Sequence, residues 1–340
     1  MQYVILGAGA AGIMAAKTIR KTDAQGEITV ISTDTQVHSR CMLHKFLSHE
    51  RSAESISFID ADFFEKNKIN WLKGKTVNKL DTVKKTVFTE DGNEIGYDKL
   101  LIATGAESFI PPVGKLREAP NVFGLRHLRD AQAIDEMAKN AENIVIIGSG
   151  LVGLDAAYGL METGKKVSIV EMAEQILPIQ LDKTGAFEYQ KRFEKAGASF
   201  YLGRKAADTL MNDEGNVSCI VLDNGEEIPC DLVIVAAGVR SALMGYVEGA
   251  FKDTLGLDLI NITTGSLDPN EPINEETNSY YNIEIGKYLL PDFMVTFSTG
   301  INNDLQSYGF LYDINNHFSV NGWMNSNDHS YIGGQWSYEF

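Results

Sequence analysis

Two glycine-rich segments with the spacing G-x-G-x-x-G lie at residues 7–12 and 148–153. Glycines at these spacings let a backbone turn tightly and approach a pyrophosphate, whose charge then rests on the amides of a helix N-terminus. A single segment of this kind is also found as a glycine turn without a ligand. Two of them in matching surroundings favour the ligand-binding interpretation, so one chain is expected to hold two dinucleotides.

The elements predicted around the two segments are the same in kind and in order. An apolar run precedes each segment, a stretch with helical periodicity follows it, and a second apolar run comes about 20 residues after the first glycines. This order predicts two βαβ units. The predicted strands are 3–6, 27–31, 144–147 and 166–171, and the predicted helices are 13–20 and 154–162.

An acidic residue at the end of the second strand of such a unit accepts hydrogen bonds from the adenosine ribose. Glu171 has this position in the second unit. In the first unit Asp34 is the only near candidate, and it is offset by about one position. No arginine directly follows Glu171 to bind a 2′-phosphate, so NADH is favoured over NADPH.

Each unit is closed by a buried strand that ends in small residues and glycine, at 97–105 and 230–238. A hairpin with a turn signal comes just before each closing strand, at 90–93 and 223–226. The two halves therefore repeat one plan, and the sequence predicts an α/β fold with two Rossmann-like domains.

Composition limits the classes of protein to which the chain can belong. The 340 residues are 44% hydrophobic and 22% charged, which is ordinary for two or three folded domains. A net charge of −16 argues against nucleic acid or an anionic membrane surface as the main partner. Residues 241–340 carry −11 of that charge and half of the aromatic residues, so the chain changes character near Ser241.

Neither export nor a disulfide framework is expected for the first part of the chain. No secretory signal precedes the first strand and no apolar stretch approaches a membrane span, so residues 1–240 are expected to be cytoplasmic. Cys41, Cys219 and Cys230 are odd in number and lack C-x-x-C spacing.

These motifs, in this order, make residues 1–240 similar to the FAD-dependent pyridine nucleotide–disulfide oxidoreductase family, in its branch of NADH oxidases, rubredoxin and nitrite reductases and coenzyme A disulfide reductases. The resemblance implies FAD at the first glycine segment and NADH at the second. Ala103-Thr104-Gly105 resembles the family's ATG turn, residues 39–43 resemble the stretch over the flavin, and Asp155 stands where many relatives carry a glutamate. The cofactor-binding residues implied are Gly7, Gly9, Ala10, Gly12, Asp34, Arg40, Thr104, Gly105, Gly148, Gly150, Leu151, Val152, Gly153, Asp155, Glu171, Ala237 and Gly238.

Cys41 is the candidate catalytic residue, because a thiolate near an oxidised flavin and a helix start can cycle through a sulfenic acid or a mixed disulfide. The alternative is a small buried residue that replaces the proline of other branches. His38, Cys41 and His44 recur at spacings of three but bring no fourth ligand, so no metal site is expected.

The chain departs from the family after residue 240. Family members return to the FAD domain through a segment with a G-D motif and then add a dimerisation domain, and residues 241–340 match neither. The expected FAD-binding domain thus has only its first segment, and its activity is expected to be impaired.

Residues 250–340 instead resemble the C-terminal domain of TamB, a subunit of the translocation and assembly module. The markers are residues 255–258, 285–292 and 338–340, and from Phe293 apolar and polar residues alternate as in strands. About five strands cannot close a barrel, so unpaired edges are expected to pair with envelope or outer-membrane proteins. The alternative is an edge hairpin array of a soluble domain.

The expected domains are 1–112 (first segment of FAD binding), 113–240 (NADH binding), a linker at 241–282 and an antiparallel β-rich, TamB-like tail at 283–340 that resembles a periplasmic or outer-membrane-facing domain. The expected function is hydride transfer from NADH to FAD and on to an unknown acceptor, with no nucleic acid involved. The alternative is a fused or truncated chain whose working part is the envelope-assembly tail.

Overall fold

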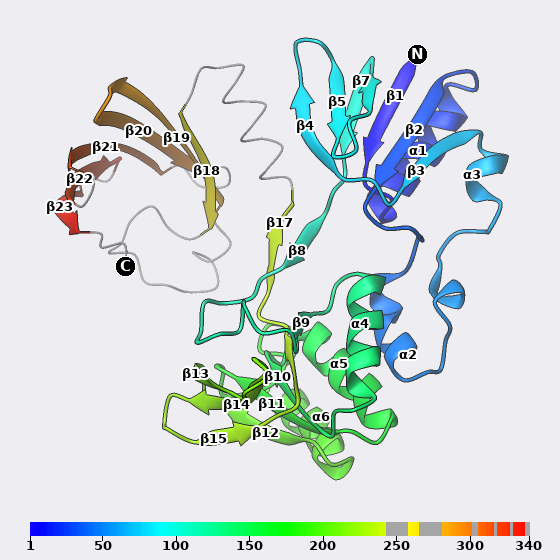
Figure 1. The fold of residues 1–340 in the computed structure, drawn as a ribbon, viewed down its shortest axis with the longest axis vertical. Helices are drawn as coiled ribbons and strands as arrows, with labels where there is room; N and C mark the ends of the chain where they lie inside the picture. Colours follow the sequence, from blue (N-terminus) through cyan, green and yellow to red (C-terminus); the bar gives the residue numbers. More distant parts are fainter. Residues whose placement is uncertain (243–257, 265–280, 301–304, 316–317, 327–328, 337–340) are drawn as a thin grey trace. The chain divides into compact units, whose positions relative to one another are not determined.

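The computed structural model describes residues 1–242, 258–264, 281–300, 305–315, 318–326 and 329–336 (Figure 1). The chain divides into two compact units, which are described separately. The first contains residues 1–76 and 99–242, and the second contains residues 77–98 and the described residues from 258 onward.

The first parallel sheet of the first unit has the strand order β3-β2-β1-β7. Helix α1 (Ala10–Thr22) connects its first two strands and packs on them. Val4, Ile5 and Leu6 are all buried, the continuous apolar pattern of a parallel strand covered on both faces. The strands are β1 (Gln2–Leu6), β2 (Glu27–Ser32), β3 (Ile69–Lys73) and β7 (Lys99–Ile102).

The second sheet repeats this arrangement with five parallel strands in the order β12-β11-β10-β16-β9. Helix α5 (Leu151–Glu162) packs against its central strands, and α4 (Leu128–Ala138) and α6 (Lys183–Lys195) belong to the same domain. The strands are β9 (Val122–Gly124), β10 (Asn143–Ile147), β11 (Lys166–Glu171), β12 (Ser199–Leu202) and β16 (Leu232–Val235).

A short segment of the first half of the chain completes the core around the second sheet. Helix α2 (Leu43–Leu47) packs against α4 and α5, and Leu43, Leu47 and Ile56 are buried in one cluster with residues of β10, β11 and β16. The sequence assigned these residues to the FAD-binding domain at 1–112, yet their packing joins the two halves of the first unit. Nearby short helices are η1 (Arg40–Met42), η2 (Glu54–Ile56) and α3 (Phe63–Lys66).

Both predicted hairpins belong to three-stranded antiparallel sheets. In the first unit these strands are β13 (Ala206–Met211), β14 (Val217–Leu222) and β15 (Glu227–Pro229). In the second unit they are β4 (Val77–Asp81), β5 (Thr86–Thr89) and β6 (Glu94–Gly96). A further antiparallel pair, β8 (Ala106–Ser108) with β17 (Val239–Ser241), joins the ends of the two closing strands.

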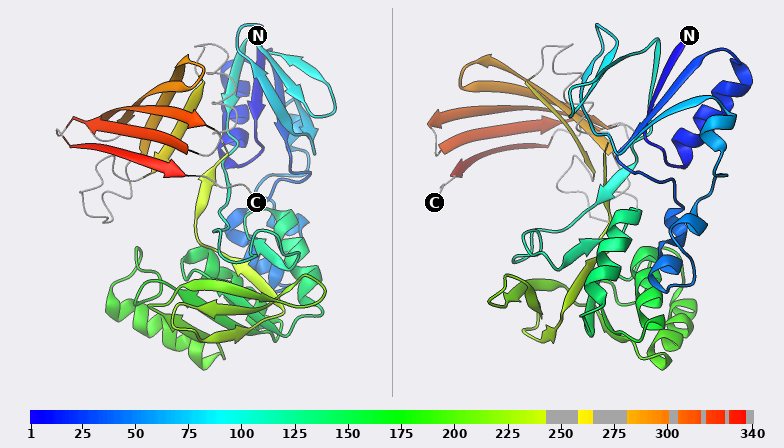
Figure 2. Two further views of the ribbon diagram at one scale, coloured as in Figure 1. Left: turned by 60° about the vertical axis from the view of Figure 1, so that its left-hand side comes forward. Right: turned by 45° about the vertical axis from the view of Figure 1, so that its right-hand side comes forward.

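The tail forms one six-stranded antiparallel sheet in chain order, whose strands lie side by side in Figure 2 (yellow to red). Strand β18 comes from residues that the sequence placed in the linker; residues 243–257 and 265–280 lie outside the described part. The strands are β18 (Leu259–Thr264), β19 (Tyr281–Leu290), β20 (Phe293–Gly300), β21 (Gln306–Asn315), β22 (Phe318–Asn325) and β23 (Ser330–Trp336).

The predicted fold class is confirmed: two parallel, Rossmann-like sheets are followed by an antiparallel β-rich tail. The described tail strands pair only with one another, so in this part of the chain none joins β3-β2-β1-β7. Within the described residues, no helix is both long and apolar enough to cross a membrane.

Candidate functional site

The second glycine segment forms the turn between β10 and α5. Gly148 has a φ of +107°, and a Cβ atom there would lie 2.6 Å from Ala236 O, so the turn requires glycine. A Cβ on Gly153 would overlap Gly148 O, whereas one on Gly150 would meet no atom within 4 Å. The first and third glycines therefore close the turn against its neighbours, and the second leaves room for a ligand to approach the backbone.

The first glycine segment, between β1 and α1, has the same construction. Gly7 has a φ of +106°, and a Cβ there would overlap Ala103 O. A Cβ on Gly12 would overlap Gly7 O, and one on Gly9 would again meet nothing within 4 Å. Both turns thus have the cradle that a pyrophosphate requires, at the N-terminus of a helix of 12 or 13 residues.

A cavity of about 500 Å3 opens beside the second turn. Gly148, Gly150, Glu171 and Ala237 line it, all four among the residues predicted for cofactor binding. This volume lies within the range of ligand pockets. The cavity places the predicted ribose acceptor and the predicted pyrophosphate turn on the walls of one space.

The carboxylate of Glu171 is already oriented by its own neighbourhood. Oε2 accepts hydrogen bonds from Ser149 N at 2.8 Å and Ser149 Oγ at 2.9 Å, and Oε1 accepts one from Ala173 N at 2.8 Å. Since a carboxylate has about four acceptor positions, one remains for a ribose hydroxyl.

Sequence reasoning missed two cations at this cavity. Arg204 and Lys205 follow β12 and line the same space as Glu171. Their backbone is tied to the site, because Arg204 N donates to Glu171 O at 3.0 Å. The available signal was the Gly-Arg-Lys sequence directly after an apolar strand that pairs with β11.

Thr104 and Gly105, the residues of the ATG resemblance, follow β7 beside the first turn, where a Cβ on Gly7 would lie 3.3 Å from Thr104 Cα. Thr104 Oγ1 is buried and has no hydrogen-bond partner, an orphaned polar atom that a ligand would satisfy. Gly105 has a φ of +72°, and a Cβ there would lie 3.3 Å from the guanidinium of Arg40. The residues present therefore fit a dinucleotide at this turn, with Arg40 beside it.

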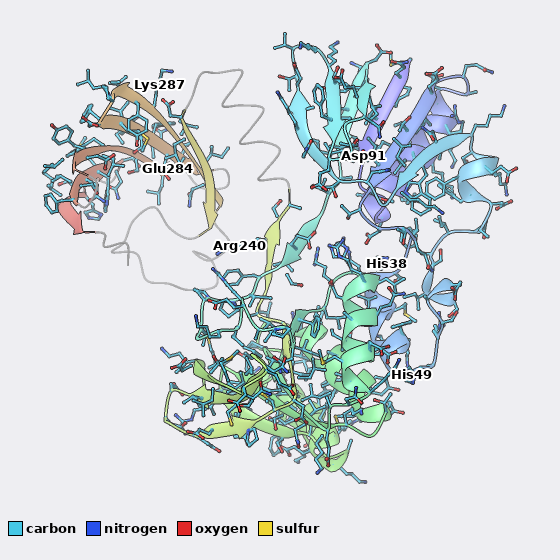
Figure 3. All side chains as sticks on the ribbon, viewed as in Figure 1. His38, His49, Asp91, Arg240, Glu284 and Lys287 are labelled. Carbon is cyan, nitrogen blue, oxygen red and sulfur yellow. The ribbon has the colours of Figure 1, made fainter. Side chains whose placement is uncertain are left out.

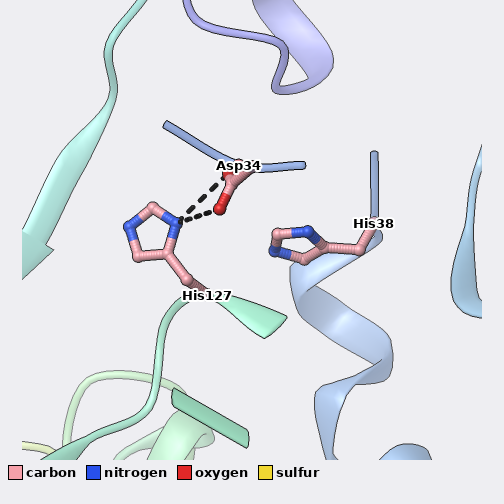
Figure 4. A group of neighbouring side chains, drawn as sticks. All are labelled: Asp34, His38 and His127. Atoms are coloured by element: carbon pink, nitrogen blue, oxygen red, sulfur yellow. Dashed lines mark hydrogen bonds and ion pairs between the residues drawn. The ribbon is translucent and has the colours of Figure 1, made fainter. Parts of the chain in front are cut away.

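Asp34 has a different environment from Glu171. It lies beyond the end of β2, and its carboxylate oxygens are 3.3 Å from His127 Nδ1 (Figure 4). Burial acts to raise the pKa of Asp34, but the hydrogen bond from His127, together with the charges of His127, His38 and Arg129, holds the pKa below the usual range. The predicted ribose acceptor of the first unit is thus engaged by a histidine.

A small cavity of about 50 Å3 is lined by residues of both halves of the first unit, including Arg40, His44, Arg126, Val152 and Asp155. His44 Nδ1 is 3.6 Å from Asp155 Oδ2. Burial raises the pKa of Asp155 and opposes the lowering effect of His44. Burial, followed by the charge of Arg40, lowers the pKa of Arg126.

Among the remaining predicted residues, Ala10, Leu151 and Val152 begin helices α1 and α5, and Gly238 follows β16 with a φ of +105°. Cys41 lies in η1 and is exposed, so it is not the buried structural residue of the alternative interpretation.

Comparisons with known proteins agree with this arrangement. The family model for pyridine nucleotide-disulphide oxidoreductases matches residues 1–258, and the model for the TamB C-terminal domain matches residues 218–340.

The chain is 33% identical over 250 residues to the epsilon subunit of the NADH-dependent phenylglyoxylate dehydrogenase of Aromatoleum evansii, covering 73% of this chain and 58% of that protein. It is 34% identical over 249 residues to an NADH oxidase of Methanocaldococcus jannaschii, covering 71% and 55%. The chain thus spans little more than half the length of these two relatives. A NAD-dependent persulfide reductase from A. fulgidus shares the fold, with a TM-score of 0.68 at 21% identity over 89% of this chain and 72% of that one.

Proposed function

Because the chain belongs to the pyridine nucleotide-disulphide oxidoreductase family, we propose that it binds NADH at the second glycine turn and passes a hydride to FAD at the first. When bound, the nicotinamide supplies a hydride and the flavin accepts it. The chain's own residues bind and orient the two cofactors. The observation that carries the proposal is the cavity in which Gly148, Gly150 and Glu171 meet.

NADH rather than NADPH is proposed because the carboxylate of Glu171 is fixed by three hydrogen bonds at the ribose end of the cavity. A negative charge held at this position repels a 2′-phosphate and accepts from a ribose hydroxyl. Arg204 and Lys205 line the same cavity, and their positive charges act against this discrimination.

We expect Glu171→Ala to weaken NADH binding by about 1–2 kcal/mol, roughly 5- to 30-fold, through loss of charge-assisted hydrogen bonds. Calorimetric titration of the full chain with NADH measures this change. Glu162→Ala is the matched control, since Glu162 is an exposed carboxylate at the far end of α5. Equal NADH affinities in the wild type and in Glu171→Ala would rule out this site.

A second function is proposed for the tail alone. Residues of β20 to β23, among them Phe293, Phe310, Trp323 and Ile332, line an apolar hollow of about 740 Å3 on the six-stranded sheet. With the match to the TamB C-terminal domain, this supports an envelope-assembly module. If the tail has this function, we expect the full chain to fractionate with cell-envelope membranes. Recovery only in the soluble fraction would refute this second proposal.

A further inference from the structure

An arginine and a lysine reach the cavity beside the second glycine turn from the strand next to Glu171. Strands β11 and β12 pair in parallel, with Glu171 at the end of β11 opposite Leu202 at the end of β12. Parallel strands end at the same edge of a sheet, so the loop after β12 brings Arg204 and Lys205 to the end of β11. No arginine directly follows Glu171 in the sequence, but the strand register supplies one from the neighbouring strand.

The backbone of Arg204 is held at the ribose end of this cavity. Arg204 N donates a hydrogen bond to Glu171 O at 3.0 Å. The side chains of Arg204 and Lys205 line the same space of about 500 Å3 as the carboxylate of Glu171. Two positive charges are therefore anchored next to the predicted ribose acceptor. Because the anchor is a main-chain N–H, it remains when the side chain of Arg204 is removed.

Neither cationic side chain has a partner within the described part of the chain. The guanidinium of Arg204 and the ammonium of Lys205 make no ion pair or hydrogen bond there, and both residues are exposed. Arg240 differs: its guanidinium carbon lies 4.2 Å from the ring centroid of Phe109, another residue of the cavity wall (Figure 3). Unpaired cations on the wall of a ligand cavity favour an anionic group on the ligand.

We propose that Arg204, together with Lys205, binds the 2′-phosphate of NADPH, so that this site accepts NADPH as a second and weaker cofactor. A guanidinium binds a phosphate through two parallel hydrogen bonds, and an ammonium adds a point charge. NADH stays the favoured cofactor, because the carboxylate of Glu171 repels the 2′-phosphate. The inference rests on the proposed function, since it concerns the ribose end of the same cavity. The competing explanation is two solvated cations that contact no ligand.

The test is calorimetric titration of the full chain with NADH and, separately, with NADPH. We expect Arg204→Ala to weaken NADPH binding at least about tenfold and NADH binding less than about threefold, because NADH has no 2′-phosphate. For NADPH, Arg204→Lys should give an intermediate affinity, since it keeps the charge but loses the paired hydrogen bonds. Arg192→Ala is the matched control: it removes the same charge from an exposed position in the last turn of α6, and neither affinity should change by more than about twofold.

Two further measurements separate phosphate binding from a general effect of charge. We expect Glu171→Ala to strengthen NADPH binding while it weakens NADH binding, and the double variant Glu171→Ala/Arg204→Ala to lose that gain. Adenosine 2′,5′-bisphosphate and AMP repeat the comparison without nicotinamide, so hydride transfer has no part in the result. Arg204→Ala and Lys205→Ala should each weaken binding of the bisphosphate more than binding of AMP.

Three results would overturn the proposal and leave the proposed function standing. They are undetectable NADPH binding by a wild type that binds NADH, equal weakening of both cofactors by Arg204→Ala, and equal effects of Arg204→Ala and Arg192→Ala. A wild type that binds neither NADH nor NADPH would overturn the proposed function, and this inference with it. Circular dichroism checks that each variant folds.

Discussion

The two glycine turns are alike in their glycines and differ in their acids. Glu171 is held by Ser149 and Ala173 with its carboxylate on the wall of a cavity. Asp34 at the corresponding place is engaged by His127. Glu171 therefore lines a cavity large enough for a ligand, whereas the carboxylate of Asp34 already lies within hydrogen-bond distance of a histidine.

The reactivity of individual cysteines tests the assignment of Cys41 as the catalytic residue. Cys41 is exposed, whereas burial raises the pKa of Cys230 to about 12. Because only the thiolate reacts, Cys230 stays protonated at pH 8, and we expect a thiol reagent at that pH to label Cys41 first. Mass spectrometry of the labelled peptides locates the label. Labelling of Cys230 ahead of Cys41 would contradict this burial.

At the scale of elements, the contact between α2 and α5 joins the two halves of the first unit. Gly159 on α5 permits it, because a Cβ there would lie 2.7 Å from His44 O and 3.0 Å from Leu47 Cβ. We expect Gly159→Ala to destabilise the chain by about 1–3 kcal/mol, since backbone cannot yield as a side chain can.

Denaturant unfolding measures that change. Gly185→Ala in α6 is the control, because its nearest neighbour would be the side-chain Oδ1 of Asp182 at 3.2 Å, and alanine favours a helix. Equal destabilisation by both substitutions would mean that the close packing of α2 on α5 is not the cause of the lost stability in Gly159→Ala.

The strands and helices of the βαβ units were predictable because glycine spacing and apolar runs are local signals. The strands at 3–6 and 144–147 are confirmed within β1 and β10. Contacts between distant segments left no such signal. His127 reaches Asp34 across 93 residues, and Arg204 reaches the Glu171 cavity from the loop after β12. Strand β18 was missed because its run of Leu259–Thr264 is short and a long polar stretch follows directly after it.

At the scale of the whole molecule, the chain combines a reductase-like part with a TamB-like part, whose family models overlap at 218–258. We expect limited proteolysis of the full chain to cut first within 241–282, outside β18, where glycine, asparagine, proline and acidic residues cluster. Mass spectrometry of early fragments identifies the cut. A first cut inside either βαβ unit, or a uniformly resistant chain, would favour a single integrated fold.

The most direct test of the central claim is anaerobic titration of the full chain with NADH in the presence of FAD, followed by the visible flavin absorbance. We predict that NADH bleaches the flavin band and that Glu171→Ala shifts the titration to higher NADH. We also predict that added FAD is required, because no tail strand among the described residues adds to the four-stranded first sheet. A flavin band unchanged at saturating FAD and NADH would contradict the proposed hydride transfer.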